Sequence, residues 1–215
     1  MGDGRGPRQT GRPLTRSIDS LIRSRRMTRR FQTSQLPNGL LFELADLARR
    51  APSAGFSQGT HFVLLEHADL ETFWQVSGAG EWFRDRQPGV LAAPAVVVAV
   101  ADPAAYADRY SATDKAGHGL EAAAGWDVPF WIADTAMATQ QLLLLIEDRG
   151  LGALYFGVFR NRDQVAALLG LPDSSVTVGA VAVGYRAASD VASGTPIRRP
   201  RLPAEQVVHR GRWLR

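Results

Sequence analysis

Arginine side chains cluster in two short segments near opposite ends of the chain. Residues 25–31 read R-R-M-T-R-R-F, and residues 198–203 read R-R-P-R-L-P. A guanidinium group forms paired hydrogen bonds with phosphate or carboxylate oxygens, and adjacent guanidinium groups repel one another unless an anion neutralises them. Each segment could be a solvated basic surface or a contact for nucleic acid. The two could also meet in the fold to bind one small anion.

The charge distribution separates these two ends from the rest of the chain. The formal net charge is +4, but residues 1–30 carry net +7, residues 198–215 net +5 and residues 31–197 net −8. Of the 25 basic residues, only Lys115 is not an arginine. The acidic body, and the apolar motifs between the arginines, argue against nucleic acid as a partner.

Two further segments have compositions suited to a flat ligand. Residues 51–58, A-P-S-A-G-F-S-Q, combine small side chains with hydroxyl groups and one amide, so that the backbone there can approach a ligand closely. Residues 150–157, G-L-G-A-L-Y-F-G, read as a strand bounded by glycines. Taken alone, the first segment could also be an ordinary turn that ends a helix.

Missing motifs exclude several kinds of chemistry. The chain has no cysteine, which excludes disulfides, iron–sulfur clusters and thiolate-bound zinc. It has no P-loop motif, no G-x-G-x-x-G after a strand and no G-x-S-x-G, so we expect neither nucleotide hydrolysis, a Rossmann site nor α/β-hydrolase chemistry. We expect no metal site, because metal-ligand spacing is absent from the four histidines, His61, His67, His118 and His209.

The sequence predicts a protein that does not enter a membrane. Its apolar runs, residues 92–101 and 142–146, are much shorter than the roughly 20 residues that span a bilayer. The N-terminal residues lack the apolar stretch of a secretory signal. We therefore expect a cytoplasmic location.

The pattern of apolar residues predicts one α+β domain. Residues 1–14 are rich in Gly, Pro and Arg, and we expect a disordered basic tail there. A single domain then covers residues 15–215, with a C-terminal arm over 198–215. Apolar spacing predicts helices over 15–26, 40–51, 70–76, 128–149 and 163–169, and strands over 61–65, 96–101, 153–156 and 175–185. Strands and helices mix without strict alternation, which favours the α+β class.

Three local features follow from the same reading. The helix over 128–149 is apolar nearly all round and should be central and buried, with Asp127 as its N-cap and Pro129 in its first turn. Residues 102–127 show no regular pattern, and a loop of that length is usually functional or mobile. In the C-terminal arm, Val207 and Val208 could add a strand edge.

Taken together, the motifs resemble the FMN-dependent nitroreductase family in their order and spacing. The resemblance covers residues 15–213, and W-D-V-P-F-W at 126–131 is similar to an actinobacterial-type branch. The matching pieces are R-R-x-x-R-x-F at 25–31, A-P-S-x-x-x-x-Q at 51–58, G-L-G at 150–152, L-G-L-P at 169–172, V-x-V-G-Y at 181–185 and R-x-R-x-P at 199–203.

The resemblance implies a fold and an activity. The fold would be a three-layer α+β sandwich, with a central, mainly antiparallel sheet flanked by helices, in an intertwined homodimer with two FMN sites at the interface. The activity would pass a hydride from NAD(P)H through flavin N5 to a nitroaromatic, quinone or similar small-molecule acceptor, in a ping-pong cycle. No catalytic side chain is implied, because the cofactor supplies the chemistry.

The resemblance also implies roles for individual residues. The FMN phosphate and ribityl chain would meet the segment containing Arg25, Arg26, Met27, Thr28 and Arg29, and the same phosphate would be approached by Arg199 and Arg201. The isoalloxazine ring would be lined from the other subunit by Pro52, Ser53, Ala54, Gly55 and Gln58. Beside the ring, with a backbone N–H near N5, would lie Tyr155, Phe156 and Gly157. Candidate substrate-stacking residues are Tyr110, Trp126 and Phe130.

Some positions depart from the family pattern. Many relatives carry Ser where Met27 stands, Asn where Phe56 stands and Pro-Trp in place of Gly59-Thr60. The P-S-x-G-F loop is also similar to the dimethylbenzimidazole synthase branch, which breaks the flavin itself. That branch has a carboxylate at the position of Met27. The alternative is therefore a flavin-binding or flavin-fragmenting protein without ordinary nitroreductase turnover.

Overall fold

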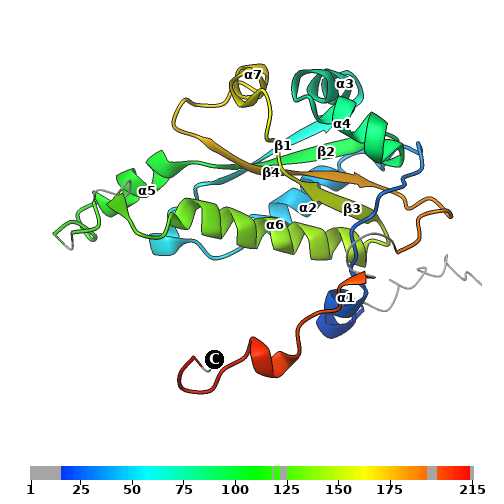
Figure 1. Cartoon of the computed structure of the whole chain (residues 1–215). Helices are drawn as coiled ribbons and strands as arrows, with labels where there is room; N and C mark the ends of the chain where they lie inside the picture. Colours follow the sequence, from blue (N-terminus) through cyan, green and yellow to red (C-terminus); the bar gives the residue numbers. More distant parts are fainter. Residues whose placement is uncertain (1–15, 118, 122–124, 193–197, 214–215) are drawn as a thin grey trace, which may run out of the picture.

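The computed structural model describes residues 16–117, 119–121, 125–192 and 198–213. The tail predicted over residues 1–14 lies outside these ranges. Within them, a four-stranded sheet carries helices on both faces (Figure 1). This three-layer α+β arrangement confirms the fold class that the sequence predicts.

The sheet is antiparallel at each strand pairing, and its strands lie in the order β1-β2-β4-β3. Every residue of β2 is buried, which explains why its sequence A-V-V-V-A-V-A has no polar alternation. The strand order places β1 and β3 at opposite edges of the sheet. The bounds are β1 Thr60–Glu66, β2 Ala95–Ala101, β3 Gly152–Phe156 and β4 Val176–Gly184.

Alternate residues of β2 face two separate cores. Val97 packs in the core under α2 (Leu40–Ala48) and α6 (Phe130–Asp148). Val96 and Val98 pack in the core on the other face (Figure 1), which is covered by α3 (His67–Val76), α4 (Ala79–Arg86) and α7 (Arg162–Leu168). The alternation is the two-residue period of a strand. None of the helices in the described ranges has the length and apolar character needed to cross a membrane.

The expectation of no regular structure over residues 102–127 is wrong. Residues Pro103–Tyr110 form α5, and the Asp102 side chain accepts a hydrogen bond from the N–H of Ala104 at 2.9 Å. A capping aspartate followed by proline in the first turn is a helix-start signal. The sequence prediction places this signal at Asp127 and Pro129 instead.

At α6 the predicted cap is wrong. The helix begins at Phe130 with Pro129 at its N-cap position, and no side chain caps it. The helix α4 also has no counterpart in the sequence prediction, because it is short and follows Gly78, whose φ of 65° lies in the left-handed region.

The C-terminal arm leaves the body beside α1 (Ile18–Ser24) in the view of Figure 1. Val207 and Val208 form no strand there; they follow a short 3-10 helix, Ala204–Gln206, and both are exposed. Trp213 is 79% exposed and stacks on His209, with ring centroids 4.7 Å apart. The apolar side chains of this arm therefore bury little surface against the body of their own chain.

A buried carboxylate joins the helix α6 to the N-terminal segment. Glu147 accepts hydrogen bonds from Arg186 and from Arg16 at 3.1 Å, and from the Ser24 hydroxyl at 3.0 Å. Burial raises the pKa of Glu147, but the charge of Arg186 and the hydrogen bonds outweigh burial, so this pKa lies below its ordinary value. The carboxylate is therefore charged at neutral pH and holds α1, α6 and the end of β4 together.

We expect Glu147→Gln to lower the free energy of unfolding in urea by about 2–3 kcal/mol at pH 7, because two cations lose their partner. The pKa of Glu147 is lower in the folded state than in the unfolded state. The difference in unfolding free energy between the wild type and the variant should therefore be fully present above the ordinary glutamate pKa of about 4.3 and should shrink as the pH falls below it. Asp148→Asn, one residue along the same helix, is the control. Equal stability of the two variants at pH 7 would contradict the assignment.

Candidate functional site

The N-terminal arginine segment runs along the edge of the sheet beside β3. Met27 forms a parallel bridge with Ala153, and the N–H of Thr28 donates to the carbonyl of Ala153 at 2.8 Å. The N–H of Tyr155 lies 3.4 Å from the sulfur of Met27. The structure therefore brings together two of the predicted binding segments, residues 25–29 and 155–157.

The arginines in this segment are not equivalent. The Arg26 guanidinium pairs with the buried carboxylate of Asp190, and its Nη2 donates to the Asp190 carbonyl at 2.6 Å. Asp190 also accepts the backbone N–H groups of Arg29 and Arg30, at 2.9 and 3.0 Å. In contrast, Nη1 of Arg25 is buried and has no hydrogen-bond partner in the described part of the chain. The Arg26 guanidinium is thus occupied by Asp190, whereas Nη1 of Arg25 can still donate a hydrogen bond to a ligand.

Asp190 contacts the arginine segment, and sequence reasoning missed it. It follows β4 in the stretch A-A-S-D, which carries no motif. Only the fold shows that its carboxylate reaches residues 26–30, some 160 positions earlier in the chain.

At the end of β3 the side chains point in different directions. Tyr155 lies over Gly179 and donates its hydroxyl to the carbonyl of Val178 at 2.8 Å, and burial raises the pKa of this phenol. Phe156 instead stacks on Trp74 in the core, with ring centroids 5.6 Å apart. A ligand at this strand end would meet the backbone, the edge of Phe156 and the exposed part of Tyr155, whose side chain is 36% exposed.

The loop over residues 51–58 lies before β1, at the opposite edge of the sheet. The N–H of Gln58 donates to the Ser53 hydroxyl at 3.0 Å, and Gly55 has a φ of 61°. A Cβ on Gly55 would lie 2.9 Å from the ring of Tyr110, so glycine permits this close packing. A cavity of about 370 Å³ adjoins the loop, and Ser53, Phe56 and Gln58 are among its lining residues.

A buried aspartate on α6 fixes this loop. One oxygen of Asp134 accepts the backbone N–H of Ala54 at 2.8 Å and the hydroxyl of Tyr106 at 2.7 Å. Burial, and then the hydrogen bond to Asp134, raise the pKa of Tyr106 far above the physiological range, so this hydroxyl remains a donor. Sequence reasoning missed Asp134; the available signal was a charged residue in the N-terminal half of α6, well away from the two acids at its C-terminal end.

The predicted substrate residues form one aromatic cluster next to the same loop. Trp126 is at its centre, with ring centroids 4.8 Å from Tyr110 and 5.8 Å from Phe130. Arg109 links the cluster to the loop by donating to the carbonyl of Gly55 at 2.8 Å. Tyr110, Trp126 and Phe130 therefore belong with the β1 edge of the chain.

The predicted site residues thus fall into two half-sites. The arginine half-site comprises residues 25–29 and 155–157 at the β3 edge, and the loop half-site comprises residues 52–58 with the aromatic cluster at the β1 edge. Strands β2 and β4 separate the two within one chain. Arg199 and Arg201 are exposed on the C-terminal arm, which passes α1 in Figure 1.

The model of the nitroreductase family matches residues 22–185. This chain belongs to the nitroreductase family. The NADH dehydrogenase of Thermus thermophilus is 31% identical over 193 residues, which cover 86% of this chain and 91% of that protein. The NADPH-flavin oxidoreductase of Vibrio harveyi is 37% identical over 81 residues, covering 37% of this chain and 31% of that protein. The solved structure of B. megaterium NfrA1 has a TM-score of 0.70 at 24% identity, covering 93% and 76% of the two chains.

The two half-sites of this nitroreductase-family chain both lie within the matched range, whereas Arg199 and Arg201 lie beyond it. The residues of the arginine half-site fit a cofactor that carries a phosphate. A buried guanidinium N–H without an acceptor is unfavourable, and Arg25 presents one at this position.

We expect Asp134→Ala to lower the free energy of unfolding by about 2–3 kcal/mol, because two donors lose a charged acceptor. Asp134→Asn should retain most of the stability, since the amide oxygen can accept the same hydrogen bonds. Urea unfolding measures the global effect, and hydrogen exchange at the Ala54 amide measures the local one. Unchanged exchange at Ala54 in Asp134→Ala would show that Asp134 does not fix the loop.

Proposed function

We propose that this protein is a homodimeric, FMN-dependent oxidoreductase that oxidises NADH or NADPH and reduces nitroaromatic, quinone or similar acceptors. Family membership, with relatives named as an NADH dehydrogenase and an NADPH-flavin oxidoreductase, makes it an NAD(P)H-dependent oxidoreductase of the nitroreductase type. The observation that carries the more specific proposal is the buried Nη1 of Arg25, which has no hydrogen-bond partner among the residues that the structure describes.

The arginine half-site would hold the phosphate of FMN. Arg25 supplies the free donor, and Arg29 adds a second guanidinium whose only hydrogen bond among the described residues is a long one, 3.4 Å, to the Met27 carbonyl. The carboxylate of Asp190 binds the Arg26 guanidinium and the backbone N–H of Arg29. It therefore does not occupy the guanidinium groups of Arg25 and Arg29. Arg26 then contributes by fixing the segment rather than by direct contact.

The chemistry supplied by bound FMN is two-electron transfer, with a hydride taken from NAD(P)H in one half of a ping-pong cycle and delivered to the acceptor in the other. Tyr155 and Phe156 turn their side chains toward β4 and the core, which leaves the backbone at the end of β3 accessible. An N–H at Gly157 would orient the ring there. The loop half-site would cover the ring and exclude water.

The separation of the two half-sites supports a homodimer. Since β2 and β4 lie between them, one chain does not bring both to the same ligand. Apolar side chains suited to an interface are exposed on α1 and α2, where Ile18 and Ile22 are each 57% exposed and Phe42 is 70% exposed. In the proposed dimer, residues 52–58 of one chain complete the arginine half-site of the other, and Arg199 and Arg201 approach the phosphate.

A colour test distinguishes the proposal from its alternative. The purified protein should be yellow, bleach under nitrogen with NADH or NADPH, and regain colour when a nitroaromatic is added. A yellow protein that does not bleach would favour the flavin-holding or flavin-fragmenting alternative. A colourless protein that takes up no FMN would exclude both, and mass spectrometry of the compound released on heating identifies the flavin.

We expect Arg25→Ala to weaken FMN binding by about 1.5–3 kcal/mol, which is roughly 10- to 150-fold in Kd. The reason is the loss of a charged hydrogen bond to the phosphate. Fluorescence titration with FMN measures the effect, and Arg23→Ala, on the exposed face of α1, is the matched control. Equal affinity of the two variants would contradict the phosphate assignment.

Arg201→Ala tests the contribution of the C-terminal arm in the same titration. A loss of similar size is expected, because Arg201 is exposed in the single chain and would gain an anionic partner only in the assembled site. Arg212→Ala, also in the arm, is the control. Sedimentation velocity should show a dimer for the wild type, and a monomer that still binds FMN tightly would overturn the two-chain site.

A further inference from the structure

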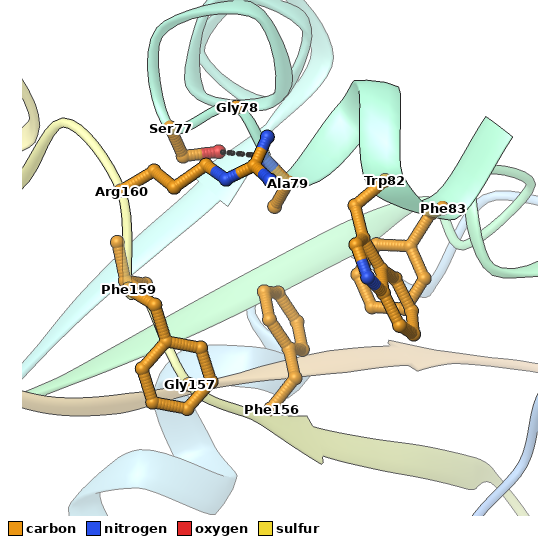
Figure 2. Close-up of a pocket in the computed structure, with 10 residues that line it drawn as sticks. Ser77, Gly78, Ala79, Trp82, Phe83, Phe156, Gly157, Phe159 and Arg160 are labelled. Atoms are coloured by element: carbon orange, nitrogen blue, oxygen red, sulfur yellow. Dashed lines mark hydrogen bonds between the residues drawn. The ribbon is translucent and has the colours of Figure 1, made fainter. Parts of the chain in front are cut away.

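A cavity of about 230 Å³ opens where β3 ends, between that strand end and the α3–α4 connection. Figure 2 shows the aromatic side chains of Trp82, Phe83, Phe156 and Phe159 around it. Trp74 lies behind these rings and packs edge-on against Phe83, with centroids 5.8 Å apart. The cavity thus has a rigid aromatic floor.

Phe159 lies at the mouth of the cavity. Its side chain is 88% exposed, and its ring lies so close to Gly157 that a Cβ there would be 2.3 Å from the ring. An aromatic ring in solvent above a glycine backbone offers a flat surface on which another ring can stack.

One cation adjoins this aromatic cavity. Arg160 is the only charged residue among those that line it (Figure 2). A Cβ added to Gly78 would lie 3.6 Å from both Cβ and Cδ of Arg160, so the Arg160 side chain packs along the Gly78 backbone. Arg160 makes no side-chain hydrogen bond or ion pair with another described residue. The cavity therefore combines ring-stacking surfaces with a guanidinium that has no counter-ion within the described ranges.

We infer that this cavity receives acceptors that consist of one aromatic ring bearing a carboxylate, and that Arg160 selects them by pairing with the carboxylate. The inference rests on the proposed function, because Phe156 and Gly157 belong both to this cavity and to the proposed FMN site. Arg160 would be a specificity-determining residue.

The size and the charge of the cavity decide between ligand classes. Pockets for larger ligands measure about 300–1,000 Å³, so a cavity of about 230 Å³ suits a single ring. A neutral ring would stack equally well but would leave the guanidinium without an anion. A carboxylate on the ring satisfies both the aromatic floor and Arg160.

A matched pair of acceptors tests the inference. With 4-nitrobenzoate and its neutral analogue 4-nitrobenzyl alcohol, kcat/KM of the wild type should favour the acid roughly 10- to 100-fold. In Arg160→Gln this ratio should fall toward one, mainly through a higher KM for the acid. Arg162→Gln, at the exposed start of α7 outside the cavity, should keep the wild-type ratio.

Binding without turnover provides an independent measurement. Benzoate should change the tryptophan fluorescence of the purified protein in a saturable way, and benzyl alcohol should not at the same concentration. The benzoate response should be lost in Arg160→Gln and retained in Arg162→Gln.

The outcomes separate this inference from the proposed function. If both nitro compounds are reduced equally well and Arg160→Gln changes neither reaction, the inference is wrong while the proposed activity stands. If NADH and NADPH are not oxidised with any acceptor, the proposed activity fails, and the benzoate titration alone decides whether the cavity binds an aromatic acid. If Arg160→Gln loses both the preference for the acid and the benzoate response while Arg162→Gln keeps both, the inference about the cavity is established.

Discussion

The carboxylate of Asp190 organises the N-terminal arginine segment. It is buried, pairs with the guanidinium of Arg26 and accepts two consecutive backbone N–H groups, those of Arg29 and Arg30. Without it, four arginines in six positions would repel one another at the edge of the sheet. One negative charge neutralises one arginine and fixes the backbone, so that the remaining guanidinium groups can bind an external anion with little loss of conformational freedom.

The strand order of the sheet places the two half-sites at opposite edges of the chain. Because the strand order is β1-β2-β4-β3, the arginine half-site accompanies β3 and the loop half-site accompanies β1. The loop is held by a buried acid, Asp134, as the arginine segment is held by Asp190. Each half-site is therefore held by hydrogen bonds within its own chain, although the two half-sites lie at opposite edges of the sheet.

Much of this architecture can be predicted from the sequence, because local patterns encode it. The apolar run of β2 follows from burial, and the family motifs follow from glycine, proline and arginine spacing. The helix over 128–149 is present as α6, but the expectation that it is buried nearly all round is wrong for this chain, because Ile132 and Met137 are exposed. Asp190 and Asp134 could not be predicted, because the segments that they hold in the candidate site, residues 26–30 and the loop at Ala54, are 80 or more positions away in the chain. Helix α5 was missed although it has a clear start at Asp102, since its apolar face is weak and its single buried side chain is Tyr106.

A further consequence follows from the position of the two half-sites. If the completed site needs one half from each chain, then occupancy by the cofactor and association of the chains are thermodynamically linked. A compound that binds only the assembled form raises the affinity of the chains for each other by mass action, and dilution of the protein must in turn release the compound. Redox capacity would then depend on how much of this protein a cell contains, even at constant flavin.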